Sequence, residues 1–262
     1  MPVGSPIGSD VAPTGAPALQ LRDVGRRFGG IVAVAGVTLS VPAGQRRAVI
    51  GPNGAGKTTL FNLIAGEFRP TAGRVVLFGE DVTRLRPHQR IRRGLTRTYQ
   101  TAVLFGGLTV ADNLYLAVRG VRAGRMSFRR PRADDPDRAR ARGLASRVGL
   151  AGVLESKAAA LSHGERRQLE LGMALAGEPR LLMLDEPAAG LSPGERVRLT
   201  DLLLGLDPAI TVLLIEHDMD VALRVADAVT VMHNGRAIAD GRPEEIRASA
   251  TVQEVYLGTG AA

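Results

Sequence analysis

The sequence predicts an α/β fold on three observations. A glycine-rich loop at residues 51–58 follows a short apolar run and precedes residues with helical spacing. Two further apolar runs, residues 181–184 and 211–215, are continuous, as in central parallel strands that are covered on both faces. Both runs are followed by acidic residues, and ligands bind at the carboxyl edge of open α/β sheets. We therefore expect a parallel sheet with a binding site at that edge.

The glycine-rich loop has the pattern of a phosphate-binding loop, in which a glycine, four further residues and Gly-Lys-Thr hold fixed positions. Glycines let backbone N–H groups turn toward phosphate oxygens, and the helix that follows adds its positive end. The Lys57 ammonium can reach the terminal phosphates, and the Thr58 hydroxyl can bind magnesium. The residues that we expect to hold a nucleotide here are Gly51, Asn53, Gly54, Gly56, Lys57, Thr58 and Thr59.

The composition supports this interpretation and excludes others. Lys57 and Lys157 are the only lysines among 34 basic residues, so the overall composition does not explain a lysine at the loop position. A compact ammonium fits between phosphates where a planar guanidinium does not. There is no cysteine, which excludes disulfides and thiolate metal sites. No apolar run reaches the roughly 18 residues of a membrane-spanning helix.

The net charge of +8 is compatible with a nucleic-acid partner, an anionic membrane surface or simply an arginine-biased composition. Ten arginines lie between residues 119 and 147, which predicts either a solvated surface or a surface near anionic lipid head groups. Aromatic residues make up 3% of the chain and tryptophan is absent, which does not favour a surface that stacks on nucleic-acid bases.

The N-terminal third is predicted to be mostly extended. Residues 1–18 are rich in Pro, Gly, Ser and Ala, and we expect a flexible tail. Alternating apolar and polar residues from Leu19 predict an edge strand, and residues 32–41 and 75–78 predict two more strands. Phe28 lies on a small β-element before the loop, where it could stack on adenine, although a core position is the commoner use of such a residue.

The middle of the chain is predicted to be helical. Helical patterns at residues 108–118 and 139–148 surround the arginine-rich segment, and no strand is predicted among them. Further on, Ser162 and Glu165 have the spacing of a capping box before a helix over residues 168–176. With a glycine beside it, this is either an ordinary helix start or an anion site.

The C-terminal third is predicted to complete the sheet. The first continuous apolar strand leads into Asp185 and Glu186, which we interpret as a magnesium-binding carboxylate and a group that polarises water. A helix over residues 195–206 then crosses to the second continuous apolar strand, whose end places His217 at the same sheet edge. A hairpin around Asn234-Gly235 and a helical tail over residues 243–257 follow.

In combination, these segments resemble the nucleotide-binding subunit of ATP-binding cassette (ABC) transporters, over residues 19–258. Residues 51–58 are similar to the Walker A loop, residues 181–185 to Walker B, and residues 161–165 to the signature that ordinary phosphate-loop ATPases lack. His163 departs from the commonest signature, which has glycine at that position. The resemblance gives further positions a role: Phe28 as the aromatic that stacks on adenine, Gln100 as the Q-loop glutamine, Glu186 as the catalytic glutamate, residues 189–192 as the D-loop and His217 as the switch histidine.

The resemblance implies a P-loop NTPase (RecA-like) core with an antiparallel β subdomain and an inserted α-helical subdomain. The implied ranges are a core with the β subdomain at 19–95 and 155–242, a helical subdomain at 96–154 and a C-terminal helical tail at 243–258.

The resemblance also implies the chemistry of the site. Two cassettes hold ATP between them, by the Walker A loop of one and by Ser162, Gly164 and Glu165 of the other. Mg²⁺ is expected between Thr58, the phosphates and Gln100, with Asp185 in its outer shell. Glu186, His217 and Gln100 are the expected catalytic residues.

Within the family, the chain is most similar to importers of branched-chain amino acids. The stretches that carry this similarity are Arg-Gly-Leu-Thr-Arg-Thr-Tyr-Gln at 93–100, Asp-Glu-Pro-Ala-Ala-Gly-Leu at 185–191, Ile-Glu-His-Asp-Met at 215–219 and Val-Tyr-Leu-Gly at 255–258. The signature with His163 and the C-terminal stretch also resemble urea and short-amide importers, which remain an alternative.

The resemblance implies partners and a location. The partners are a second ABC ATPase subunit, the same or related, two transmembrane permeases and, indirectly, a solute-binding protein, at the cytoplasmic face of the plasma (inner) membrane and without nucleic acid. ABC ATPases that act on ribosomes or DNA are the remaining alternative. One set of motifs and no sustained heptads do not favour it.

Overall fold

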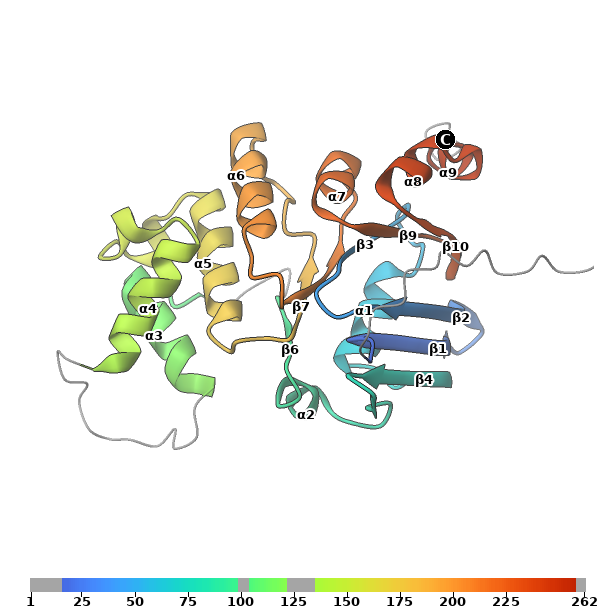
Figure 1. Ribbon diagram of the computed structural model, residues 1–262, viewed down its shortest axis with the longest axis horizontal. Coiled ribbons are helices and arrows are strands. Elements are labelled where there is room, and N and C mark those ends of the chain that lie inside the picture. Colours follow the sequence, from blue (N-terminus) through green and yellow to red (C-terminus); the bar gives the residue numbers. More distant parts are fainter. Residues whose placement is uncertain (1–15, 99–103, 122–134, 258–262) are drawn as a thin grey trace, which may run out of the picture.

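The structure, a computed structural model, describes residues 16–98, 104–121 and 135–257. The described residues form two β-sheets, and helices surround the larger one. The smaller sheet lies at one end of the molecule and a group of helices at the other (Figure 1). Within the described residues, no helix is long and apolar enough to cross a membrane.

The smaller sheet is antiparallel. Its strands are β1 (Leu19–Phe28), β2 (Ile31–Val41), β4 (Ala72–Leu77) and β5 (Glu80–Asp81), in the order β2-β1-β4-β5. The prediction that the first strand lies at an edge is wrong, because β1 pairs with both β2 and β4. Its apolar–polar alternation reflects one buried face, and an inner strand of an antiparallel sheet shows that pattern as an edge strand does.

The larger sheet is parallel except for its last strand. Its strands are β3 (Arg46–Ile50), β6 (Leu95–Arg97), β7 (Leu181–Asp185), β8 (Thr211–Ile215), β9 (Ala228–His233) and β10 (Arg236–Gly241), in the order β10-β9-β3-β8-β7-β6. Every residue of β7 and of β8 is buried, which confirms the prediction of central strands covered on both faces. The antiparallel hairpin of β9 and β10 also agrees with the prediction.

Strand β6 was not predicted from the sequence, and neither were β5 or the helices over residues 87–91 and 219–225. Strand β6 pairs in parallel with β7 and forms the edge of the larger sheet. Three residues are too few to show a period of two, and only the first of them is buried. The strand matters because its last residue, Arg97, reaches the candidate site.

Helices cover the larger sheet, and a group of helices lies beyond it at one end of the molecule. Most of them match predicted helices to within a few residues. Their bounds are α1 (Lys57–Ala65), α2 (Pro87–Ile91), α3 (Val110–Val121), α4 (Pro136–Arg147), α5 (His163–Leu175), α6 (Pro193–Leu204), α7 (Met219–Val225), α8 (Pro243–Ala248) and α9 (Ala250–Leu257), with short 3₁₀ turns η1 (Ala151–Val153) and η2 (Ala158–Ala160). The predicted C-terminal helix is divided in two, because the backbone at Ser249 is extended.

Two buried clusters form the core, and α1 lies in one of them. Apolar residues of α1, among them Phe61, pack with buried residues of β1, β2 and β4 and with one face of the larger sheet. The other face of that sheet belongs to a second cluster with α5, α6 and α7, and α3 and α4 pack against α5. Helix α1 is therefore held between the two sheets, which fixes the loop that precedes it. The boundaries of the core and helical subdomains given above remain a prediction.

Candidate functional site

The glycine-rich loop connects β3 to α1 directly. A buried strand ends at Ile50 and a helix begins at Lys57, which is the context that a phosphate-binding loop requires. The helix is capped by Gly56 in the left-handed conformation, without a side-chain hydrogen bond at its start. The first N–H groups of α1 are therefore available to an anion.

Two glycines bring the loop against both sheets. A Cβ atom at Gly56 would lie 2.4 Å from the carbonyl oxygen of Ala33 in β2, and a Cβ atom at Gly235 would lie 2.9 Å from the same oxygen. The N–H of Gly235 donates to the carbonyl oxygen of Ala55 at 3.0 Å, and its own carbonyl accepts from the N–H of Ala35 at 2.8 Å. The predicted β9–β10 turn therefore holds the loop in place from one side, and β2 holds it from the other.

Lys57 is buried at the centre of the loop. Its ammonium donates to the carbonyl oxygens of Gly51 and Pro52, at 2.5 and 3.0 Å. Burial lowers the pKa of Lys57, and the carboxylates of Glu186 and Asp185 oppose that shift. The loop thus holds a cation whose present partners are its own carbonyl groups.

Asp185 ends β7 in a buried ion pair. Arg97 donates to its Oδ2 at 2.7 Å and to Oδ1 of Asn62, in α1, at 2.5 Å. The side chains of Arg97 and Asp185 are only 7% and 5% exposed, so the pair lies in a medium of low dielectric. Removing one partner of such a pair typically costs about 3–5 kcal/mol. Arg97 therefore joins β6, β7 and α1 at the point where the sheet meets the loop.

Glu186 and His217 lie together at the same sheet edge. The Nδ1 atom of His217 is 3.8 Å from Oε2 of Glu186, which agrees with the prediction that the ends of β7 and β8 bring the two residues to one edge. Glu186 has a φ of 48°, which is rare for a residue other than glycine. Its N–H donates to the carbonyl oxygen of Ile215 at 3.0 Å, which supports this backbone. Unfavourable backbone conformations of this kind gather at functional sites.

Glu216, between β8 and His217, is a site residue that the sequence analysis missed. It is fully buried, and its Oε1 accepts from the N–H of Ala188, two residues after Glu186. Burial raises the pKa of Glu216, against the hydrogen bond from Ala188 and the nearby His217. A glutamate after an apolar strand suggests an exposed loop, and nothing local in the sequence signals that it turns inward.

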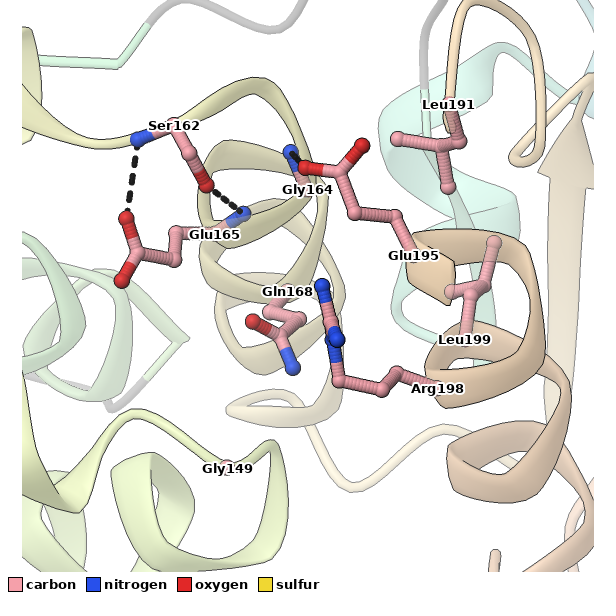
Figure 2. Close-up of a pocket in the computed structure, with 9 residues that line it drawn as sticks. All are labelled: Gly149, Ser162, Gly164, Glu165, Gln168, Leu191, Glu195, Arg198 and Leu199. Carbon is pink, nitrogen blue, oxygen red and sulfur yellow. Dashed lines mark hydrogen bonds between the residues drawn. The ribbon is translucent and has the colours of Figure 1, made fainter. Parts of the chain in front are cut away.

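The signature residues lie at the start of α5. The capping box is present as predicted: Oγ of Ser162 accepts from the N–H of Glu165, and Oε2 of Glu165 accepts from the N–H of Ser162. Figure 2 shows this pair beside a pocket between α5 and α6. The ring of His163 points elsewhere, with Nε2 3.2 Å from the carbonyl oxygen of Ala189. A glycine at position 163 would not make this contact.

The remaining predicted positions are distributed as follows. Phe28 ends β1 and is 38% exposed, so it is not a core residue, and its ring packs edge-on against Phe68 with the Arg26 guanidinium over it. Asn53, Gly54 and Thr58 are exposed at the loop. Gln100 lies outside the described residues. Within the described part of the chain, the hydrogen bonds of Ser162 and Gly164 run within α5 and to α6, not to the phosphate loop.

Comparison with known proteins decides the family. A family model described as ABC transporter matches residues 34–189, and a second, described as branched-chain amino acid ATP-binding cassette transporter, matches residues 238–262. The chain belongs to the ABC transporter family. Within that family it is an ATP-hydrolysing, ATP-binding subunit, and the predicted ABC ATPase fold is confirmed.

The similar proteins span almost the whole chain. The high-affinity branched-chain amino acid transport ATP-binding proteins BraF of Pseudomonas aeruginosa and LivG of Escherichia coli are 40% and 38% identical to it over 252 residues, which cover 92% of this chain and 98% of each relative. Among solved structures, the ADP conformation of MJ1267, an ATP-binding cassette of an ABC transporter, is similar with a TM-score of 0.82. Its sequence is 31% identical over 92% of this chain and 99% of that chain.

The buried carboxyl of Glu216 makes stability depend on pH. Its raised pKa means that the folded state favours the protonated acid, so this contribution to stability is complete below the ordinary value of 4.5 and is lost as pH rises through the folded pKa. Glu216→Gln mimics the protonated acid. We expect the free energy of unfolding of Glu216→Gln, relative to that of the wild type, to increase with rising pH. The total increase should be about 1.4 kcal/mol for each pKa unit between the folded and unfolded values.

Urea unfolding of both proteins between about pH 5 and 8 measures this difference. Glu254→Gln, at an exposed position of α9, is the matched control and should follow the wild type throughout. A difference between Glu216→Gln and wild type that does not change with pH would show that Glu216 is ionised in the fold.

Proposed function

We propose that this chain powers the import of branched-chain amino acids by hydrolysing ATP between two paired cassettes. The observation that carries the proposal is its similarity, over 92% of the chain, to BraF and LivG, whose names state branched-chain amino acid transport. The match at residues 238–262 supports the same substrate class over urea and short amides. The sequence resemblance supports the pairing of cassettes.

The phosphate loop binds the nucleotide. Backbone N–H groups of the loop and the first turn of α1 donate to the phosphates. Lys57 leaves the carbonyl oxygens of Gly51 and Pro52 and turns its ammonium to the terminal phosphates. Phe28, exposed at the end of β1, stacks on adenine. Asn53, Gly54, Gly56 and Thr59 complete the loop around the phosphates.

The donors at this edge fit Mg²⁺. Within the described residues no group of three or more His, Cys, Asp or Glu could hold a metal by itself. Mg²⁺ bound with a nucleotide needs few protein ligands, because phosphates and water supply the rest. The Thr58 hydroxyl and Gln100 are the expected direct ligands, and the Asp185 carboxylate, which accepts from Arg97, would support the ion from its outer shell. When bound, the ion would neutralise charge on the phosphates while the γ-phosphoryl group passes from ADP to water.

Glu186 and His217 carry the chemistry. Glu186 accepts a proton from the attacking water as general base, and its backbone, supported by Ile215, holds the carboxylate at the sheet edge. His217 hydrogen-bonds the γ-phosphate from the neighbouring strand end, with Gln100 as a further catalytic residue. The buried pair of Arg97 and Asp185 keeps this edge aligned with the loop. Catalysis is then mostly positioning and charge stabilisation.

The second half of the site comes from a second cassette. Ser162, Gly164 and Glu165 at the start of α5 face the ATP that is bound to the phosphate loop of the partner, the same or a related chain. ATP thereby joins the two cassettes, and its hydrolysis separates them. The two cassettes bind two membrane permeases at the cytoplasmic face of the plasma (inner) membrane. The permeases convert this motion into transport, and a solute-binding protein delivers the amino acid. No nucleic acid takes part.

The assembly tests the transport function. We expect a tagged chain, recovered from detergent-solubilised membranes, to bring with it two multi-spanning permeases and a second ATPase, identified by mass spectrometry. A solute-binding protein encoded with them should bind leucine and not urea or short amides, as calorimetry can measure. Recovery of ribosomal or DNA-repair proteins instead would contradict transport and leave the ATPase chemistry intact.

The role of Glu186 has its own test. Glu186→Gln keeps the shape of the side chain and removes the base, so we expect ATP binding within about threefold of wild type and turnover lowered by about 100-fold or more. Size-exclusion chromatography should show a dimer that persists with ATP. Glu254→Gln is the control and should turn over ATP as the wild type does. Normal turnover in Glu186→Gln would remove Glu186 from the mechanism.

A further inference from the structure

A carboxylate from α6 already occupies the start of the signature helix. Oε1 of Glu195 accepts a hydrogen bond from the N–H of Gly164 at 3.0 Å, across the gap between α6 and α5 (Figure 2). Its other oxygen, Oε2, accepts from the N–H and the hydroxyl of Ser192, at 2.9 and 2.7 Å. One side chain therefore caps its own helix with one oxygen and holds the neighbouring helix with the other.

This second contact is not part of ordinary helix capping. The capping box of α6 needs only Oε2 of Glu195. In α5, the Ser162 hydroxyl already accepts from the N–H of Glu165, and the N–H of Gly164 is left for another acceptor. Glu245, at the same place in the capping box of α8, accepts from the N–H of Arg242 in its own helix. The bridge to a second helix is what distinguishes Glu195.

A glycine at position 164 lets the Glu195 side chain lie this close to α5. A Cβ atom at position 164 would lie 2.6 Å from Oε1 of Glu195 and 2.8 Å from two of its carbons. Hydrogen bonds from Ser192 and Gly164 hold the pKa of Glu195 below its ordinary value, so the group is an anion at neutral pH. Gly164 thus carries a negatively charged ligand supplied by the chain itself.

We propose that Glu195 is a positioning residue that occupies the Gly164 N–H until the γ-phosphate of partner-bound ATP displaces it. The inference rests on the proposed function, in which Gly164 faces that phosphate. Two anions do not share one N–H group at close range, because like charges repel and a single hydrogen is available. Closure of the two cassettes therefore requires Glu195 to withdraw.

The chain offers the displaced carboxylate another partner. Oε2 can keep both bonds to Ser192, so α6 stays capped when Oε1 leaves Gly164. Arg198, three residues later on α6, lines the same pocket, and its positive charge already acts on Glu195. Withdrawal of Glu195 is thus a small rotation toward Arg198 rather than a loss of structure. The ATP concentration needed for closure then depends on how strongly Glu195 holds Gly164.

ATP-driven dimerisation measures this competition. In the Glu186→Gln background, which is expected to trap the dimer, analytical ultracentrifugation gives the ATP concentration for half-maximal dimer. We expect Glu195→Gln, which keeps the oxygen but not the charge, to lower that concentration about threefold, and Glu195→Ala to lower it about tenfold. In the otherwise wild-type chain, Glu195→Ala should lower KM for ATP and change kcat less than twofold.

Glu245→Ala is the matched control, because it removes a capping-box glutamate from α8, away from the signature. It should leave the ATP requirement unchanged. If Glu186→Gln dimerises with ATP and Glu195→Ala needs as much ATP or more, the competition is contradicted and the proposed function stands. If Glu186→Gln never dimerises, alone or with the ATPase that is recovered with it, the pairing itself fails and the inference fails with it.

Discussion

The site depends on the close approach of two glycines to a single carbonyl group. Gly56 of the phosphate loop and Gly235 of the β9–β10 turn both lie against the carbonyl oxygen of Ala33 in β2, where a methyl group would overlap it. Hydrogen bonds from Gly235 to Ala55 and from Ala35 to Gly235 complete the contact. The loop is thereby fixed between the two sheets before any nucleotide arrives. Such a preformed arrangement of N–H groups lowers the entropy that binding costs.

Two of the groups that the proposed function assigns to ATP form hydrogen bonds within the chain. The Lys57 ammonium donates hydrogen bonds to carbonyl oxygens of its own loop, and the N–H of Gly164 donates to the carboxylate of Glu195. Buried or half-buried polar groups without partners would be costly, so these internal hydrogen bonds stabilise the fold. Each must be exchanged when ATP binds. The affinity for ATP is therefore the difference between two sets of hydrogen bonds, one internal and one with the nucleotide.

The spacing of residues close together in the sequence predicted much of the fold and of the candidate site. The rest depends on contacts between residues that are far apart in the sequence. The phosphate loop, the two buried central strands and the capping box at Ser162 follow from spacing within a few residues, and topology alone brought Glu186 and His217 to one edge. The ion pair of Arg97 and Asp185 was not predictable, because β6 has only three residues and pairs with residues of β7 that are 86 positions further along the chain. Likewise, nothing in the sequence shows that Glu216 turns inward, or that Glu195 crosses from one helix start to another.

The affinity of Gly235→Ala for ATP, measured by titration calorimetry, tests the central claim that packing at Ala33 fixes the phosphate loop. Gly79→Ala is the matched reference. Both glycines have positive φ in hairpin turns, at 77° and 86°, but a Cβ atom at Gly79 would meet nothing closer than 4.0 Å. Both variants should lose about 1 kcal/mol of stability from backbone strain. Only Gly235→Ala should bind ATP more weakly, by about tenfold or more, which corresponds to about 1.4 kcal/mol. Equal affinities in the two variants would contradict the claim.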